Sequence, residues 1–369
     1  MMTNNKTIGL YIHIPFCSVK CPYCDFYSFN PEQNIKKEYV NKICEDLKKC
    51  DYKFDTVYFG GGTPSKLDAQ DIADVLSCAG KTDDAEITVE CNPSDVSGID
   101  GERYFEVLAS AGVNRISMGL QSAVDAERKA LGRKAGKAEV ERALLNIRNA
   151  GIDNISLDLM LGIPRQTENS LKYSIDFCLE SGIKHLSAYI LKIEEGTHFY
   201  KVKDNLNLPD EDTVCDFYLK TSQLLRESGF KHYEISNFAL PGYESRHNLK
   251  YWKDEEYLGL GPSAHSFLNG TRYYYPNDIG RYLNGENMLF ESSGGDAEEY
   301  MMLALRLDSG IDFADFEKKF SLKLKPEFYE KCKFYSDKSF ADFNSKRFNL
   351  NPNGFIISNS VISDLINLL

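Results

Sequence analysis

The sequence lacks long apolar runs. No stretch of its 369 residues approaches the roughly eighteen consecutive apolar side chains that a membrane-spanning helix needs. Met1–Lys6 is polar, and the short apolar run after it contains His13 and no small-residue cleavage site, so we expect no secretory signal. We therefore expect a cytoplasmic protein with reduced thiols. No anchor or basic amphipathic helix indicates a membrane surface, so any peripheral association would go through partner proteins.

Basic charge is also scarce. The chain carries 43 Lys and Arg against 55 Asp and Glu, a net charge of −12. Because nucleic-acid binding needs a basic surface, we expect no nucleic-acid partner. Internal repeats and low-complexity tracts are absent as well. The composition, 42% hydrophobic and 27% charged, is that of a soluble globular protein, and the length predicts two or three domains, or one large barrel with an appendage.

The first half of the chain alternates two kinds of segment. Short apolar or alternating segments predict β-strands over Thr7–Ile14, Thr56–Phe59, Glu86–Cys91, Arg115–Gly119, Asn154–Leu161 and His185–Leu191. Amphipathic segments between them predict helices over 36–48, 68–76, 102–111, 139–150 and 170–180. Six such units predict an α/β fold, a partial (β/α)6 barrel of the TIM type around a parallel sheet.

The regular alternation stops near Gly196. We therefore expect a barrel over residues 1–195, a connecting region over 196–290 with a helix at 210–228, and a C-terminal domain over 291–369. The last domain contains predicted helices at 297–307 and 312–320, a hairpin around Asn351–Gly354 and a final short helix. This mainly helical order resembles a winged helix, but acidic residues outnumber basic ones there, so we interpret it as a packing domain.

Ten cysteines are too sparse for a disulfide scaffold. Three of them, Cys17, Cys21 and Cys24, form C-x3-C-x2-C directly after the first predicted strand. Three thiolates on one short loop are costly unless a cation neutralises them, so we expect a metal or an iron–sulfur cluster. They could hold three irons of a [4Fe–4S] cluster and leave the fourth iron open. Alternatively, His13 could complete a Cys3His zinc site. The other seven cysteines have no metal-ligand spacing and are expected to be ordinary thiols.

The cysteine spacing, with Tyr23 before Cys24, resembles the radical S-adenosylmethionine (radical SAM) superfamily. Other motifs are similar to its oxygen-independent coproporphyrinogen oxidase group and, within that group, to the HemW branch of haem chaperones. They are Tyr11-Ile-His-Ile-Pro-Phe-Cys17, Gly60-Gly-Gly-Thr-Pro64, Glu90-Cys-Asn-Pro93, Gly119-Leu-Gln-Ser122, Leu131-Gly-Arg133, Asp158-Leu-Met-Leu-Gly-Ile-Pro164, Tyr233-Glu-Ile-Ser-Asn-Phe-Ala239 and Arg246-His-Asn-Leu-Lys-Tyr-Trp252. The likeness covers essentially the whole chain.

The resemblance implies a protein that binds a [4Fe–4S] cluster and S-adenosylmethionine (SAM) and transfers haem to acceptor proteins, as a monomer or a homodimer. The alternative is a radical enzyme of porphyrin biosynthesis that decarboxylates coproporphyrinogen III. Two departures favour the chaperone branch. The oxidising branch usually has a further cysteine where this chain has Phe26, and a long N-terminal extension where only sixteen residues precede Cys17.

In a barrel of this type the loops after the strands build the site, and the motif residues fall there. The resemblance implies that Gly61, Gly62 and Thr63 contact SAM, and glycine allows the close backbone approach that this needs. Arg133 is implied as the partner of the methionine carboxylate, for which a guanidinium offers a bidentate fork. The remaining implied cofactor contacts are Glu90 and Asp158 at the ribose or ammonium, Gln121 at the ribose or adenosyl part, and Tyr11 and Tyr23 beside the cluster.

His247, Tyr251 and Trp252 form a second group. Imidazole is a common axial ligand of haem iron, and the two aromatic rings could stack on a porphyrin. We therefore predict His247 as a haem ligand. The alternative is a polar loop that closes the mouth of the barrel, with His247 hydrogen-bonded to a backbone group.

Overall fold

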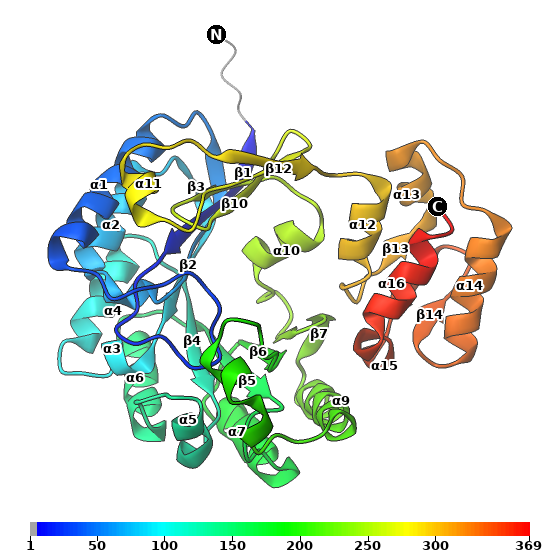
Figure 1. The fold of residues 1–369 in the computed structure, drawn as a ribbon, viewed down its shortest axis with the longest axis horizontal. Coiled ribbons are helices and arrows are strands. Elements are labelled where there is room, and N and C mark those ends of the chain that lie inside the picture. Colours follow the sequence, from blue (N-terminus) through cyan, green and yellow to red (C-terminus); the bar gives the residue numbers. More distant parts are fainter. Residues whose placement is uncertain (1–5) are drawn as a thin grey trace.

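The computed structural model describes residues 6–369, and a twelve-stranded sheet dominates it (Figure 1). Six parallel strands lie side by side in chain order and confirm the six predicted strands. They are β1 (Thr7–Ile14), β2 (Lys53–Gly61), β3 (Lys81–Cys91), β4 (Arg115–Gln121), β5 (Asn154–Leu161) and β6 (His185–Ile190). Their carboxyl ends therefore meet at one end of the sheet, where the predicted site residues lie.

Helices cover the outer face of these strands (Figure 1). The long ones are α1 (Gln33–Lys48), α2 (Ala69–Cys78), α4 (Gly101–Ser110), α6 (Lys137–Asn149), α7 (Glu168–Glu180) and α9 (Glu211–Glu227). Short connecting helices are η1 (Pro64–Lys66), α3 (Pro93–Val96), α5 (Asp125–Ala130), α8 (His198–Lys201) and η2 (Lys203–Asn205). Strand β1 shows why the layers form. Its alternate residues Leu10 and Ile12 are fully buried in the core with these helices, whereas Tyr11 and His13 face the interior of the barrel.

The described strands do not close into a ring, so the barrel is partial, as expected. The two edges of the sheet are β12 (Leu289–Ser293) and β7 (Lys231–Glu234). Beside β1 the sheet continues with β9 (Tyr257–Leu260), β10 (His265–Leu268) and β11 (Thr271–Tyr274), and beside β6 with β8 (Asn237–Ala239). Helix α10 (Arg246–Trp252) lies in the gap between the two edges (Figure 1). Helix α11 (Ile279–Leu283) precedes β12.

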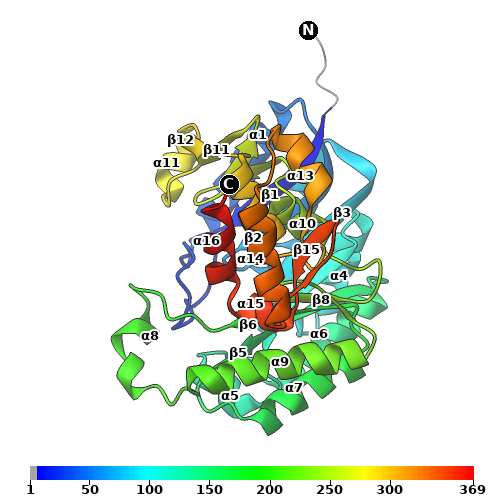
Figure 2. The ribbon, with the colours of Figure 1, turned by 90° about the vertical axis from the view of Figure 1, so that its right-hand side faces the viewer.

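The C-terminal segment forms a separate layer of helices with a three-stranded sheet (Figure 2). Its elements are α12 (Ala297–Ala304), β13 (Ile311–Asp312), α13 (Phe313–Phe320), α14 (Pro326–Asp337), β14 (Ala341–Phe343), β15 (Arg347–Leu350), α15 (Pro352–Ile356) and α16 (Ser358–Ile366). The order from α12 to β15 is that of a winged helix, as expected. Across residues 6–369, no helix combines the length and the apolar character needed to cross a bilayer.

One local prediction in this segment is wrong. The hairpin is not centred on Asn351–Gly354, because β14 and β15 are joined by residues 344–346. Asn351 instead begins a helix, and its side chain accepts hydrogen bonds from the amides of Asn353 (3.0 Å) and Gly354 (3.2 Å). Asparagine followed by proline suits a helix N-cap as well as a turn, so the local sequence did not distinguish the two.

Candidate cofactor site in the barrel

The loop after β1 carries the three cysteines of the C-x3-C-x2-C motif. Its ends are joined, because the amide of Cys17 donates to the carbonyl of Phe29 (2.9 Å) and the amide of Phe29 to that of Pro15 (2.9 Å). The three thiols are half-buried and free of disulfides. Burial raises the pKa of the Cys24 thiol, and the nearby Cys21 and Cys17 raise it further. Such thiols suit a site where iron supplies the compensating positive charge.

His13 does not complete a zinc site in this structure. Its Nδ1 lies 3.2 Å from the hydroxyl oxygen of Tyr11, and its Nε2 lies 3.2 Å from the carbonyl oxygen of Tyr27. Three thiols without a fourth protein ligand fit a [4Fe–4S] cluster with one open iron better than they fit zinc.

The glycine run at the end of β2 makes room for neighbouring rings. A Cβ atom on Gly60 would lie 2.9 Å from Cε1 of Tyr58 and 3.0 Å from Cε2 of Tyr11. A Cβ atom on Gly61, whose φ is 106°, would lie 2.6 Å from the imidazole of His13. The packing of β1 against β2 therefore requires these two glycines, independently of any ligand.

Gly62 and Thr63, which follow β2, connect this strand to the cysteine loop. The amide of Gly62 donates to the carbonyl of Ile14 at 2.8 Å, and a Cβ atom there would lie 2.8 Å from the same carbonyl oxygen. The hydroxyl oxygen of Thr63 lies 3.2 Å from the Sγ atom of Cys17. The structure thus places the predicted residues of the glycine motif directly against the loop that carries the thiols.

Two half-buried carboxylates face the barrel interior, Glu90 in β3 and Asp158 in β5. The hydroxyl of Tyr58 donates to Oε1 of Glu90 at 2.7 Å, and the hydroxyl of Ser117 donates to Oδ1 of Asp158 at 3.2 Å. Burial raises the pKa of Glu90 to about 7; the hydrogen bond from Tyr58 opposes this rise and the charge of Asp158 adds to it. Burial also raises the pKa of Asp158.

The interior holds more carboxylates than cations. Arg115 is 1% exposed and faces both Glu86 and Asp158, and Arg133 also lies near Asp158. Glu86, Glu90 and Asp158 therefore share two guanidinium groups. This surplus of negative charge favours a ligand that brings positive charge into the barrel, since such a ligand stabilises the ionised carboxylates.

Arg133, Gln121 and Tyr23 form one group beside the cysteine loop. Two guanidinium nitrogens of Arg133, Nη2 and Nε, donate to the hydroxyl of Tyr23 at 2.8 and 3.2 Å. Gln121 follows an irregularity in the register of β4 and has a φ of 67°. A Cβ atom on Gly119 would lie 2.8 Å from Nε2 of Gln121 and 3.6 Å from Nη2 of Arg133. The missing side chain of Gly119 therefore lets these polar groups meet over the strand.

His247, predicted as a haem ligand, lies inside the barrel with both ring nitrogens hydrogen-bonded. Its side chain is 1% exposed. Its Nδ1 lies 2.8 Å from Oγ1 of Thr56 and its Nε2 lies 2.7 Å from the hydroxyl of Tyr251. Burial lowers the pKa of His247 to about 3, so the ring is neutral. Because both nitrogens have partners and neither is exposed, we do not retain His247 as a haem ligand.

Two interior residues, Tyr58 and Arg115, were missed from the sequence. Tyr58 stands two residues before Gly60, so the period of two along β2 could have placed it on the interior face. Arg115 begins β4 and is fully buried, and its Nε and Nη1 atoms have no hydrogen-bond partner among the described residues. No sequence signal distinguishes this arginine from the solvent-exposed ones that are usual at strand ends.

Comparisons with known proteins identify the family. The sequence profile of the Radical SAM superfamily matches residues 11–178, and that of the HemN C-terminal domain matches residues 296–357. The protein named Heme chaperone HemW from Lactococcus lactis is 34% identical and covers 98% of each chain. This chain belongs to the HemW family. HemW of Bacillus subtilis is 32% identical over 95% of this chain and 97% of its own.

A solved structure shows the same fold. Coproporphyrinogen III oxidase (HemN) from Escherichia coli aligns with a TM-score of 0.82 over 99% of this chain and 91% of its own, at 19% sequence identity. The likeness confirms the radical SAM fold of this HemW family member. At this identity it establishes the fold alone and carries no activity across.

Proposed function

We propose that this HemW family member binds a [4Fe–4S] cluster through Cys17, Cys21 and Cys24, binds SAM inside the barrel, and carries haem to acceptor proteins. The cargo is supported by the relatives, which are named heme chaperones. One observation supports the cofactor part. The loop that carries three half-buried thiols lies at the carboxyl end of β1, with Cys17 against Thr63, and the interior side chains Glu90 and Asp158 are carboxylates.

The charges of SAM match the residues around this interior. SAM carries a positive sulfonium and a positive ammonium, which Glu90 and Asp158 would neutralise. It also carries a carboxylate, for which the guanidinium of Arg133 is the suitable partner. When bound, the cluster supplies an electron to the cofactor. The residues of this chain orient the cofactor and balance its charge.

We place the haem at the rim of the barrel rather than at His247. Val19 and Phe26, in the cysteine loop, are each 60% exposed, and Ile190, at the end of β6, is 47% exposed. The segment that follows β6 reaches the cysteine loop, since the amide of Phe199 in α8 donates to the carbonyl of Pro22 at 2.9 Å. A porphyrin offers a large apolar face that exposed apolar side chains on these segments would cover.

The experiment is an anaerobic reconstitution with iron and sulfide, followed by titration with haem and then by incubation with a haem-free acceptor protein. We expect about four irons per chain, a [4Fe–4S] absorbance spectrum, haem binding and transfer of the haem. A protein that held one zinc ion and no cluster, or that bound no haem, would contradict the proposal. Val19→Ser with Phe26→Ser should weaken haem binding and leave the iron content unchanged.

We do not propose coproporphyrinogen oxidation. The likeness to HemN shows the fold alone, and Phe26 stands where that group usually has a further cysteine. Anaerobic incubation of the reconstituted protein with coproporphyrinogen III and SAM should therefore leave the propionates intact. Formation of the decarboxylated product would reverse this conclusion.

A further inference from the structure

We infer that His247 is a positioning residue for the barrel interior: it holds the ring of Tyr58 so that the Tyr58 hydroxyl meets the carboxylate of Glu90. This assigns to the His247 segment a part in the cofactor site instead of a part in haem ligation. The inference deepens the proposed SAM site and rests on it for its functional meaning. The contact geometry on which it stands is independent of any ligand.

Helix α10, which carries His247, is fixed to the sheet at its first turn. The Oε2 atom of Glu86 accepts a hydrogen bond from the amide of Arg246 (3.1 Å), and its Oε1 atom accepts one from the amide of His247 (3.0 Å). Glu86 belongs to β3 and is 7% exposed. A carboxylate at this end of a helix satisfies backbone amides that have no partner within the helix. The backbone of His247 is therefore tied to the strand that also carries Glu90.

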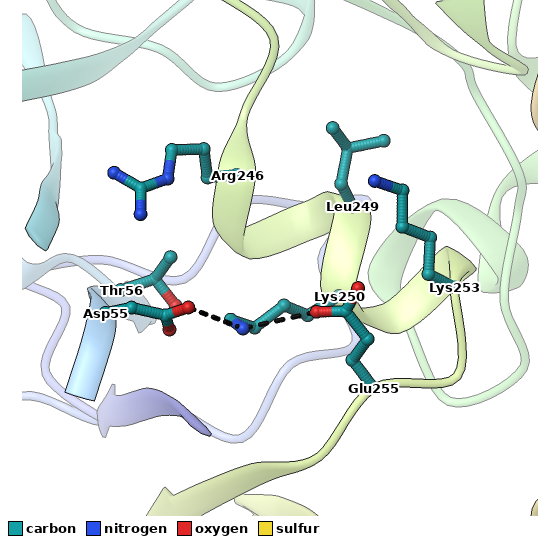
Figure 3. Close-up of a pocket in the computed structure, with 7 residues that line it drawn as sticks. All are labelled: Asp55, Thr56, Arg246, Leu249, Lys250, Lys253 and Glu255. Carbon is teal, nitrogen blue, oxygen red and sulfur yellow. Dashed lines mark hydrogen bonds and ion pairs between the residues drawn. The ribbon is translucent and has the colours of Figure 1, made fainter. Parts of the chain in front are cut away.

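Helix α10 is fixed at a second point by an ion-paired lysine (Figure 3). The Nζ atom of Lys250 lies 2.9 Å from Oδ2 of Asp55 and 3.2 Å from Oε2 of Glu255. Its side chain is 8% exposed, and it crosses β1 at a glycine, since a Cβ atom on Gly9 would lie 2.9 Å from Cδ of Lys250. Buried and paired on both sides, Lys250 prevents α10 from turning about its axis.

The imidazole of His247 is thus held in one orientation and supports two tyrosine rings. Hydrogen bonds to Thr56 and Tyr251 engage both of its nitrogens. Its ring stacks on that of Tyr58, with centroids 5.2 Å apart and planes 26° apart, and on that of Tyr11 at 6.4 Å and 28°. Tyr11 and Tyr58 also stack on each other at 6.2 Å. The three rings therefore form a triangle in which Tyr58 rests against both the imidazole and Tyr11.

Among residues 6–369, the hydroxyl of Tyr58 donates to Oε1 of Glu90 at 2.7 Å. Hydrogen bonds depend steeply on direction, so a ring that tilts away from His247 loses this bond. Three other groups affect the pKa of Glu90: the amide of Gly61, the carboxylate of Asp158 and the guanidinium of Arg115. The charge of Glu90 in turn raises the pKa of four nearby tyrosines, which are Tyr11, Tyr58, Tyr189 and Tyr251. Of these groups, Tyr58 is the one that His247 supports and that also donates a side-chain hydrogen bond to Glu90.

The test follows the Glu90 carboxyl by infrared difference spectroscopy in the cluster-reconstituted protein without SAM, using Glu90→Gln to identify the band. Tyr58→Phe removes the hydrogen bond directly and should raise the titration midpoint by about one pH unit, the usual effect of a bond to a charged group. His247→Gln should raise it similarly. The double variant should show the same shift as Tyr58→Phe alone, because His247 acts through Tyr58. Lys253→Ala, at the exposed C-cap of α10, should leave the midpoint unchanged.

A conservative variant separates positioning from general damage. His247→Phe keeps a ring under Tyr58 and should hold the midpoint closer to the wild-type value than His247→Gln does. Equal shifts in the single and double variants support the inference; additive shifts, or a midpoint in His247→Gln that matches wild type, overturn it. A variant that melts early yet keeps the wild-type midpoint counts against it as well.

The same samples distinguish this inference from the proposed function. If wild type binds no SAM while the variants shift the Glu90 midpoint, the proposed cofactor site fails and the positioning role stands. If wild type binds SAM and haem, and His247→Gln abolishes only haem binding, the positioning role fails and the haem-ligand assignment returns.

Discussion

In the proposed site, binding of SAM should become weaker as the pH falls below 7, because Glu90, the residue proposed to neutralise SAM, must then be ionised. Burial raises the pKa of Glu90 to about 7 in the free protein. A cationic ligand stabilises the carboxylate and lowers that pKa in the complex. At any pH at which Glu90 is protonated in the free protein, binding of SAM therefore releases that proton. The affinity for SAM rises with pH up to about 7.

The magnitude follows from proton linkage. If Glu90 is fully ionised in the complex, the dissociation constant for SAM is proportional to 1 + 10^(7 − pH), where 7 is the approximate pKa of Glu90 in the free protein. Between pH 7.5 and pH 6.0 the dissociation constant should therefore increase about eightfold. The amino group of the ligand titrates near pH 8, so the range stops below that value.

Anaerobic equilibrium dialysis of the cluster-reconstituted protein with labelled SAM measures this dependence. Glu90→Gln is the matched control, since it keeps the shape of the side chain and cannot ionise. We expect weaker binding that is nearly independent of pH in this variant. The reasoning is refuted if wild type binds equally well at pH 6.0 and 7.5, or if the variant keeps the eightfold change.

Four other outcomes are expected. Cys17→Ala should lose most of its bound iron, measured by iron and sulfide analysis, while Cys215→Ala, outside the loop, should keep it. His247→Ala should bind haem with unchanged affinity in an absorbance titration, and a large loss would restore it as a ligand. Glu90→Gln should be more stable than wild type at pH 8 by about 3 kcal/mol and equally stable near pH 4, measured by urea unfolding without SAM. The variant is the more stable protein at high pH because the raised pKa of Glu90 makes its ionisation costly in the folded state. The free energy of unfolding of wild type therefore falls as the pH rises from about 4.5 to 7. Gly61→Ala should lower the melting temperature strongly, because a φ of 106° and a contact of 2.6 Å with an imidazole both oppose a Cβ atom; a melting temperature equal to that of wild type would contradict that packing.

The elements of the barrel could be predicted because their signals are local. Each strand from β1 to β6 is a short apolar or alternating segment, and each long helix has an amphipathic period of its own. The cysteine motif is equally local, since three thiols within eight residues of one loop imply one site. The residues at the strand ends follow from one further rule, that parallel strands bring their carboxyl ends to the same side.

Helix α14 was not predicted, although it is twelve residues long. Phe328, Cys332 and Tyr335 are its buried residues, and they are spaced four and three apart, as a helix requires. Exposed aromatic and acidic residues between them obscure the pattern, and Pro326 reads equally well as a break or as a first helical position. The misplaced hairpin at Asn351 has the same cause, a local signal with two structural meanings.

The sequence by itself determined the family, the partial barrel and the three thiols at its carboxyl end, because each depends on residues that are close in the chain or on a regular repeat. The tertiary structure decided the surroundings of each group. His247 and Thr56 are separated by 191 positions and are joined by a hydrogen bond of 2.8 Å, and Glu86 in β3 caps the helix that carries His247. Burial, charge balance and the engagement of both ring nitrogens come from such long-range contacts, so the sequence showed a histidine able to bind iron and only the fold showed that its nitrogens were already taken.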